Sequence, residues 1–381
     1  MDDALLSPDH LAWREVVRDF VAREISREYV RVCDEAREYP YEAYDKVVRA
    51  GWLGTLVPEA FGGADFDLLA YLLMLWELGR FGVDFGTVFA IPAFCVMNIV
   101  RHGTPEQQDR YLRAFVEGRV RFSISITEPE AGSDVAAVST QATLDGEEYV
   151  LNGNKLYASA AHAKDNVICM LVRTGPAGGR HQGLSLILVP NDVPGLSMNR
   201  LPTVARRATG TNQIYLQDVR VPVANVIGSA GDGWQLIQEH LELERISVAT
   251  LYAANAQQAV ADAAAFAKER VQFGKPISSF QVIKHTLAQM QTDVDAATAL
   301  VQRAATRMAA GVPSAKEVSM AKLFASETLY KVAGEGMQIL GGAAQLPEMD
   351  MERYWREGRQ ATMGAGSSQI HRSIIAREMG L

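Results

Sequence analysis

Residues 147–159, EEYVLNGNKLYAS, decide the fold, because they place a β-strand pattern in the middle of an otherwise helical chain. The stretch is rich in residues that favour strands, and its Asn152-Gly153 pair is typical of a two-residue hairpin turn. Similar short runs lie around it: FSISIT, NVICMLVRT, LSLILVP and NQIYLQDVRVP. We therefore expect a compact antiparallel β domain, with a hairpin at Asn152-Gly153.

The chain on both sides of this β region has helical patterns. Ser7 and Pro8 suit the N-cap and first position of a helix whose apolar residues recur at helical spacing as far as Ile25. Further helices are expected to begin near Tyr41, Leu68, Val88 and Pro105, and long alanine-rich helices are expected over 233–270, 278–310 and 314–341. The predicted fold is mostly α with a β insert: an N-terminal helical domain (1–120), a β domain (121–230) and a C-terminal four-helix bundle (231–381).

Composition excludes several classes of function. The 381 residues carry a net charge of -8, so we expect no nucleic-acid partner. Cys33, Cys95 and Cys169 form no CxxC pair and the seven histidines form no HExxH motif, so we expect no metal site. The acidic start, MDDALLSPDH, does not resemble a signal peptide, and no uninterrupted apolar run reaches about twenty residues, the length of a membrane span, so we expect a cytoplasmic protein.

A carboxylate interrupts an apolar stripe in GDGWQLIQEHLELERISVATLYA. Ile237, Leu241, Val248 and Leu251 share one helical face, and Glu244 occupies the i+7 position of that face. A carboxylate there would be buried or would line a cavity, where it needs a partner or acquires a raised pKa. The pattern alone favours a structural Glu that is paired with a basic residue from another helix. It also suits a Glu that acts as a general base in catalysis.

Four other stretches carry possible binding groups. SISITEPEAGSDV (123–135) ends a strand in a polar turn that could bind a cofactor or be a simple capped turn. Arg270 in ERVQFGKPI (269–277) could bind a pyrophosphate or stabilise a helix C-terminus, and MQILGG (337–342) could be a plain glycine C-cap. ATMGAGSSQI (361–370) is a loop of small residues that opens a helix, a pattern typical of close approach by a ligand.

Taken together and in this order, TEPEAGSD, LNGNKLYAS, RVQFGKP, MQILGG and SSQIHRSIIAREM resemble the acyl-CoA dehydrogenase family over essentially the whole chain. The resemblance implies non-covalently bound FAD and a homo-oligomer, most commonly a tetramer, in which a neighbouring subunit completes the flavin site. It implies cofactor contacts from Ile126, Thr127, Gly132, Ser133, Tyr157, Ser159, Arg270, Gln272, Phe273, Ile277, Phe280, Gln338, Gly341, Gly342, Ser367 and Gln369. Tyr157 stands where the family usually has Trp.

The resemblance also implies a mechanism. A carboxylate removes the α proton of an acyl thioester, the β hydride goes to the flavin, and a backbone N–H helps to polarise the thioester carbonyl. Most straight-chain members have a Tyr-Glu pair before the closing Gly-Thr-(Ser/Asn)-Gln, where this chain has Gly364-Ala365. The usual catalytic carboxylate is therefore replaced by Ala365, whose N–H remains available as the carbonyl donor.

A branch of the family that includes enzymes like isovaleryl-CoA dehydrogenase carries its base on the preceding long helix, just before an arginine. Glu244-Arg245 in LELERISV matches that position, so the resemblance implies that Glu244 is the base. Ser133, Glu242 and Arg245 match positions at the thioester mouth and the pantetheine arm. The small Gly364 would leave room for a branched or bulky acyl group.

The resemblance leaves alternatives open. The leading expectation is an acyl-CoA dehydrogenase that passes electrons to an electron-transfer flavoprotein. The same motifs resemble crotonobetainyl-CoA reductase-like members, and the thioester could be carried by acyl carrier protein instead of CoA. Because the loop carboxylate is absent, a flavin-binding protein without dehydrogenase activity is a further alternative.

Overall fold

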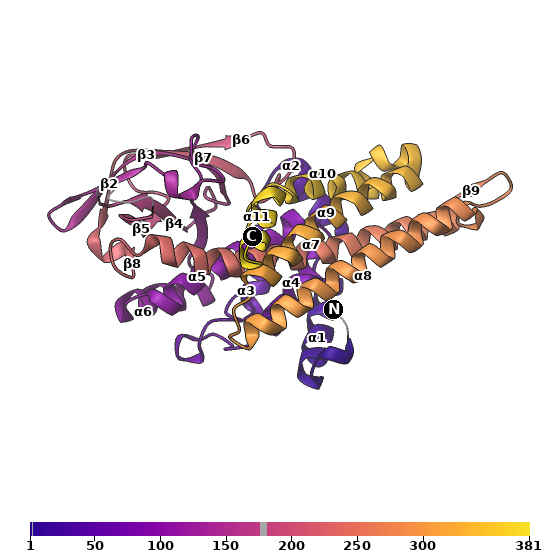
Figure 1. The fold of residues 1–381 in the computed structure, drawn as a ribbon, viewed down its shortest axis with the longest axis horizontal. Coiled ribbons are helices and arrows are strands. Elements are labelled where there is room, and N and C mark those ends of the chain that lie inside the picture. The colour runs from indigo at the N-terminus through magenta and orange to yellow at the C-terminus, as the bar shows by residue number, and fades with distance from the viewer. Residues whose placement is uncertain (2, 176–180) are drawn as a thin grey trace. The chain divides into compact units, whose positions relative to one another are not determined.

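The computed structural model describes residues 1, 3–175 and 181–381. The chain forms two compact units: unit 1 comprises Met1–Glu35, Asp67–Thr87 and Arg245–Leu381, and unit 2 comprises Ala36–Phe66 and Val88–Glu244. The predicted order of helices, then strands, then helices is confirmed (Figure 1). The three predicted domain boundaries remain predictions.

Six α-helices precede the sheet: α1 (Pro8–Glu24), α2 (Arg27–Ala36), α3 (Tyr41–Arg49), α4 (Leu68–Gly79), α5 (Val83–His102) and α6 (Pro105–Val116). The Ser7 side chain caps α1 by accepting from the His10 N–H, and Pro8 is its first residue, as predicted. The apolar pattern did not reveal that Ile25 is extended and ends α1, because its side chain is buried all the same. The helix expected near Val88 begins earlier, at Val83.

Helix α5 is long and apolar, but Asp84 and Arg101 lie within it, so it does not contradict the expectation that no uninterrupted apolar run is long enough for a membrane span. Val83–His102 is long and apolar enough to cross a membrane by length and composition, with a mean hydropathy of 1.8. However, 89% of the 18-residue apolar window within this helix is buried inside the protein. Core helices of globular proteins commonly have this composition, so the helix is weak evidence for a membrane span.

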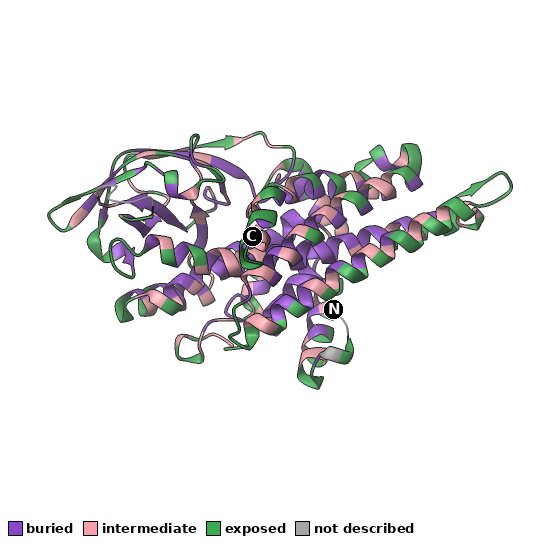
Figure 2. Ribbon diagram, viewed as in Figure 1, coloured by how far each residue is buried: buried purple, intermediate pink, exposed green. Residues whose placement is uncertain are grey.

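Within the part of unit 2 that the structure describes, eight strands form one sheet: β1 (Arg121–Ser125), β2 (Gln141–Asp145), β3 (Glu148–Ser159), β4 (Asn166–Arg173), β5 (Leu184–Pro190), β6 (Leu196–Leu201), β7 (Thr211–Pro222) and β8 (Val226–Ile227). Their order is β6-β7-β3-β2-β4-β5-β8, and β1 pairs with β4. Pairing is antiparallel except between β1 and β4 and at one bridge between β2 and β4. All eight residues of β4 are buried, so this strand is the centre of the sheet's core (Figure 2).

The predicted hairpin at Asn152-Gly153 is wrong. Strand β3 runs straight through this pair, and the turn that joins it to β2 lies at Gly146-Glu147. Gly153 instead marks an irregularity in the pairing of β3 with β7, and a Cβ added there would lie 2.7 Å from the Thr140 side-chain oxygen. The glycine is therefore required by a close approach of two segments and not by a chain reversal.

Five α-helices follow the sheet: α7 (Gly233–Glu269), α8 (Gln281–Ala309), α9 (Ala315–Leu340), α10 (Met351–Ala361) and α11 (Ser368–Glu378). Gly311-Val312-Pro313 separates α8 from α9, as predicted. A two-stranded hairpin, β9 (Val271–Gln272) and β10 (Lys275–Pro276), joins α7 to α8 and stands at the far end of these two helices (Figure 1). Short 3-10 helices occur at Asp3–Leu5, Glu59–Phe61, Val135–Ala137, Val223–Asn225, Ile277–Ser279, Gly341–Gln345 and Pro347–Met349.

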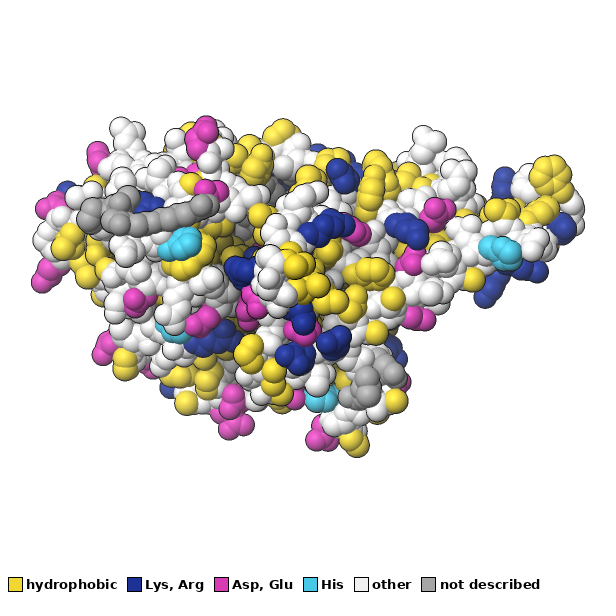
Figure 3. All heavy atoms as spheres, in the orientation of Figure 1, with side chains coloured by type: hydrophobic (Ala, Val, Ile, Leu, Met, Phe, Trp, Pro, Cys, Tyr) yellow, Lys and Arg dark blue, Asp and Glu magenta, His cyan; other side chains and the backbone are white. Residues whose placement is uncertain are grey.

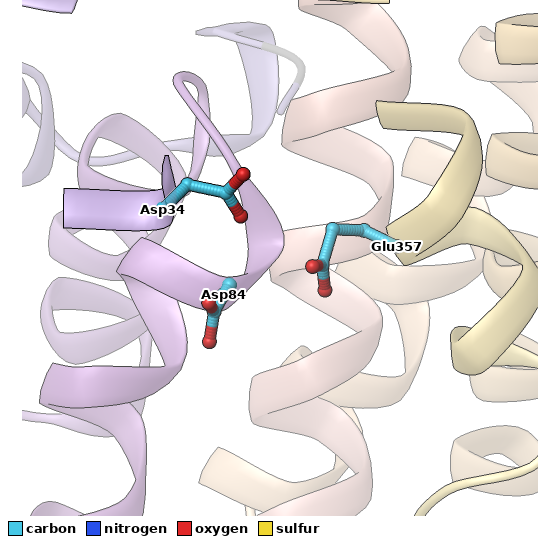
Figure 4. Close-up of side chains that lie close together, drawn as sticks. All are labelled: Asp34, Asp84 and Glu357. Carbon is cyan, nitrogen blue, oxygen red and sulfur yellow. The ribbon is translucent and has the colours of Figure 1, made fainter. Parts of the chain in front are cut away.

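Three buried carboxylates meet in the core of unit 1. Asp34 on α2, Asp84 on α5 and Glu357 on α10 have oxygens within 4.8 Å of one another (Figure 4). The Arg356 guanidinium donates to Asp34 at 2.7 Å, so a buried cation lies at the edge of the cluster. We interpret the cluster as part of an ion network that holds these helices together.

Candidate functional site

A buried ion pair organises the turn after β1. Glu128 accepts hydrogen bonds from the backbone and side chains of Ser139 and Thr140, and Lys155 on β3 donates to it at 2.8 Å. Burial acts to raise the pKa of Glu128, but the charge and hydrogen bond of Lys155 outweigh it and lower that pKa to about 2. Burial lowers the pKa of Lys155 to about 8, against the pull of Glu128.

The same lysine holds the backbone of the predicted flavin-contact residues. Lys155 Nζ donates to the Ile126 carbonyl at 3.1 Å and to the Leu171 carbonyl at 2.5 Å, and the Thr127 carbonyl accepts from the Leu156 N–H. Ile126 and Thr127 are themselves half-buried. Their backbone is thus held rigidly, and part of their surface stays accessible to a ligand.

The neighbouring predicted residues present accessible surface. Gly132 and Ser133 are exposed and Ser159 is half-buried, while Asp134 precedes the 3-10 helix Val135–Ala137 without capping it through its side chain. Tyr157 is 60% exposed and has φ +60°, at a point where the pairing of β3 with β7 shifts register. A bulky residue held in the left-handed region is uncommon, and here it displays a flat aromatic ring on the surface of unit 2. The exposed ring is accessible to a ligand, and the predicted contact with the flavin stays a prediction.

Glu244 lies on α7, one turn after His240. Its side chain is 16% exposed, and its Oε2 lies 3.6 Å from Nε2 of the fully buried His240. Ile237, Val248 and Leu251 of the predicted stripe are buried, and Leu241 is half-buried. The predicted location of a largely buried carboxylate on this face is therefore correct, whereas its role as a base stays a prediction.

The loop between α10 and α11 is held through its carbonyl groups. Lys322, on α9, is fully buried and donates to the carbonyls of Ala361 at 3.0 Å and Gly366 at 2.6 Å. The Ala365 carbonyl accepts from Arg245 Nε at 3.4 Å and lies 3.2 Å from His371 Nε2. Burial, together with the charges of Lys322 and Arg245, lowers the pKa of His371 to about 3, so His371 is neutral and donates through Nε2–H.

Ala365 combines two features that suit a backbone donor. Its φ is +53°, and its N–H has no hydrogen-bond acceptor within the part of the chain that the structure describes. Gly364 is half-buried, and a Cβ added there would lie 2.7 Å from the Gln360 side-chain nitrogen. A free, fixed N–H next to a residue without a side chain fits the predicted polarisation of a thioester carbonyl.

The other predicted residues of this loop have local structural roles as well. The Ser367 side chain caps α11 by accepting from the Ile370 N–H, and Gln369 is exposed. Ser368 Oγ is buried and has no hydrogen-bond partner among the described residues. Glu242 and Arg245 are half-buried on α7, where Arg245 Nε donates to the Ala365 carbonyl; their predicted substrate contacts stay predictions.

The predicted diphosphate- and adenosine-binding residues are on the protruding hairpin. Arg270, Gln272 and Phe273 are exposed, Phe273 to 92%, and Ile277 and Phe280 are half-buried beside them. Hydrophobic and basic side chains occur together at this tip (Figure 3). At the end of α9, Gln338, Gly341 and Gly342 are exposed, and Gly341 is the helix C-cap with φ +60°. The hairpin stands far from α11 within unit 1 (Figure 1), so one copy of unit 1 does not gather all these residues in one place.

Sequence analysis missed three side chains that lie beside Glu244 or contact the loop between α10 and α11: His240, Lys322 and His371. Lys322 follows Val318 by one helical turn on a buried face of α9, and His240 precedes Glu244 by one turn. The same interrupted-stripe pattern that singled out Glu244 could have found both. His371 follows the loop motif directly, but nothing in its sequence context indicates that its ring contacts the Ala365 carbonyl.

Comparisons with known proteins agree with this architecture. Family models of the acyl-CoA dehydrogenase N-terminal, middle and C-terminal domains match residues 7–119, 123–219 and 231–380. A probable acyl-CoA dehydrogenase of Bacillus subtilis is 36% identical, over 96% of both chains. A subunit of the caffeyl-CoA reductase–Etf complex of Acetobacterium woodii is 32% identical, over 95% of this chain and 96% of its own.

A glutaryl-coenzyme A dehydrogenase, solved in complex with glutaryl-CoA, superposes with a TM-score of 0.95 at 31% identity, over 100% of this chain and 97% of that one. Family members bind FAD and act on CH–CH bonds, which agrees with the cofactor and reaction class expected from the sequence. The chain belongs to the acyl-CoA dehydrogenase family of flavin-dependent oxidoreductases.

Proposed function

We propose that this protein oxidises an acyl thioester to the 2,3-enoyl thioester, with Glu244 as the base that removes the α proton. The observation that carries the proposal is the position of Glu244. Its side chain is only 16% exposed and lies on the helix face predicted for a base. No side chain at position 365 competes for this role, because Ala365 has no titratable group.

The closing loop supports the second part of the chemistry. The α proton of a thioester is weakly acidic, so the carbonyl must be polarised as the proton leaves. The Ala365 N–H is proposed as one donor to that carbonyl, because the contacts of Lys322, Arg245 and His371 with the loop given above go to its carbonyl oxygens and leave this N–H unused. Gly364 adds no side chain, which favours a branched or bulky acyl group.

FAD, when bound, accepts the hydride that leaves the β carbon. The proposed residues for its ring are Ile126, Thr127, Gly132, Ser133, Tyr157 and Ser159, which display accessible polar and aromatic surface in unit 2. The proposed residues for its diphosphate and adenosine are on the exposed hairpin and at the end of α9. An arm that is exposed in one copy suits a contact with the cofactor of a second copy, so we propose a homo-oligomer, most simply a tetramer.

The proposal also names an electron acceptor and the carrier of the acyl thioester. We propose an electron-transfer flavoprotein as partner, supported by the relative that is named as a subunit of a reductase–Etf complex. That relative also favours a second candidate, reduction of an enoyl thioester by the same site. CoA is the proposed carrier and the cytoplasm the proposed location, with acyl carrier protein as the alternative carrier.

The test is an anaerobic titration of the purified flavoprotein with straight, branched and betaine-type acyl-CoA thioesters, and with the matching acyl carrier protein thioesters. Bleaching of the oxidised flavin band by one class would support dehydrogenation and identify the substrate class. Glu244→Gln should slow bleaching by at least about a hundredfold, because general-base catalysis contributes about 10²–10⁴-fold. Full turnover in Glu244→Gln would exclude Glu244 as the base.

A further inference from the structure

Asn98 determines which nitrogen of His240 carries the proton. The Asn98 amide nitrogen donates to the Cys95 carbonyl at 3.0 Å and lies 2.9 Å from His240 Nδ1. The carbonyl can only accept, so the amide must present its NH₂ group on this side, and Nδ1 must be the acceptor of the second N–H. The proton of the neutral ring is therefore on Nε2, the nitrogen that faces Glu244.

Packing fixes the ring in this orientation. His240 is 2% exposed, and the Phe94 ring meets it edge-on, with centroids 5.2 Å apart and planes at 88°. Its Nε2 is buried and makes no hydrogen bond within the described chain. The 3.6 Å separation from Glu244 Oε2 is slightly longer than a hydrogen bond, and such contacts are often long in the free form of an enzyme.

The charge around this contact is controlled by its neighbours. Burial, together with the charge of Arg101, lowers the pKa of His240 to about 3, so the imidazole is neutral at any pH near neutrality. On α5, burial is the largest cause that raises the pKa of the Cys95 thiol. The contact with Cys169 on β4 and the charge of Glu244 raise that pKa as well. Thus the donor that lies next to the Glu244 carboxylate is neutral, and the Cys95 thiol of the same unit is held in its neutral form.

We propose that His240 is a positioning residue for Glu244: its fixed Nε2–H orients the carboxylate and stabilises the ionised form that accepts a proton. This inference rests on the proposed function, in which Glu244 is the base. A donor to the charged form favours that form, so His240 keeps the base ionised to lower pH than burial alone would allow.

Two variants separate donation from packing. His240→Phe keeps a ring against Phe94 and removes the donor, whereas His240→Gln keeps an N–H donor in a smaller side chain. A hydrogen bond to a charged group is worth about one pKa unit or slightly more. In His240→Phe, we expect the acid limb of the pH profile for flavin bleaching to move up by about one pH unit, which makes bleaching at the acid end about tenfold slower. In His240→Gln, we expect the acid limb to stay within about 0.3 pH unit of its wild-type position.

Infrared titration gives a readout that does not need turnover. The protonated carboxyl band that disappears in Glu244→Gln belongs to Glu244, and its midpoint should move up in His240→Phe but not in His240→Gln. Equal midpoints in wild type and His240→Phe, or equal shifts in both variants, would overturn the inference. If the wild type is not bleached by any thioester, the proposed function fails, while the infrared midpoints still decide whether His240 acts on Glu244.

Discussion

Lys155→Met tests the buried ion pair that supports the turn after β1. The lysine side chain is fully buried, and its three acceptors are Glu128 at 2.8 Å, the Ile126 carbonyl at 3.1 Å and the Leu171 carbonyl at 2.5 Å. Methionine has a similar length and no charge, so the replacement mostly preserves packing. It removes the only cation that we find paired with Glu128 in the described chain.

The expected cost follows from the partners left behind. Removing one member of a buried ion pair typically destabilises a protein by about 3–5 kcal/mol, because an uncompensated charge remains. Four hydrogen bonds from Ser139 and Thr140 still stabilise Glu128, so we expect the lower end, about 3 kcal/mol. Because Lys155 also holds the Ile126 carbonyl, flavin should be lost more readily as well.

The assay is urea unfolding of wild type, Lys155→Met, Glu128→Leu and the double variant. The double variant should recover much of the loss seen in Lys155→Met, since no buried charge is left without a partner. Lys164→Met, at an exposed lysine in the same unit, is the control and should change the free energy of unfolding by less than about 1 kcal/mol. A Lys155→Met protein within 1 kcal/mol of wild type, or single-variant losses that simply add in the double variant, would refute the reasoning.

Three further predictions concern pH, the cofactor and the closing loop. The pKa of Glu128 is lowered to about 2 from the ordinary 4.5, so its ionised form contributes stability that is complete above pH 4.5 and is lost as pH falls toward 2. Glu128→Gln should therefore flatten this part of a stability–pH curve measured by thermal unfolding. Arg270→Ala should weaken FAD binding about tenfold or more in flavin-release titrations, whereas Lys268→Ala, at an exposed neighbouring lysine, should bind FAD normally; equal affinities would contradict the assignment of Arg270. Lys322→Met should lower the free energy of unfolding by about 3 kcal/mol and slow flavin bleaching by thioesters, and unchanged bleaching would show that the loop does not depend on Lys322.

Local patterns predicted the elements well where local energy decides them. The N-terminal cap of α1 and the break between α8 and α9 depend on neighbouring residues, and both were predicted correctly. Asn152-Gly153 has a local preference for a turn, but pairing of β3 with β7 on both sides of this pair outweighs it, and the reversal occurs at Gly146-Glu147 instead. The end of α1 at Ile25 was missed because a buried apolar residue fits the same periodicity whether the backbone is helical or extended.

By itself, the sequence determined the family and the helix face on which Glu244 lies, because motif order and 3.6-residue periodicity are properties of the chain. Only the tertiary structure decided the protonation and direction of His240 Nε2, since its partner Asn98 is 142 residues away in sequence. The contacts of Lys155 with Glu128 and of Lys322 with the Gly366 carbonyl likewise join distant segments. Buried polar groups need partners, but periodicity shows only that a group is buried, and packing decides which partner it finds.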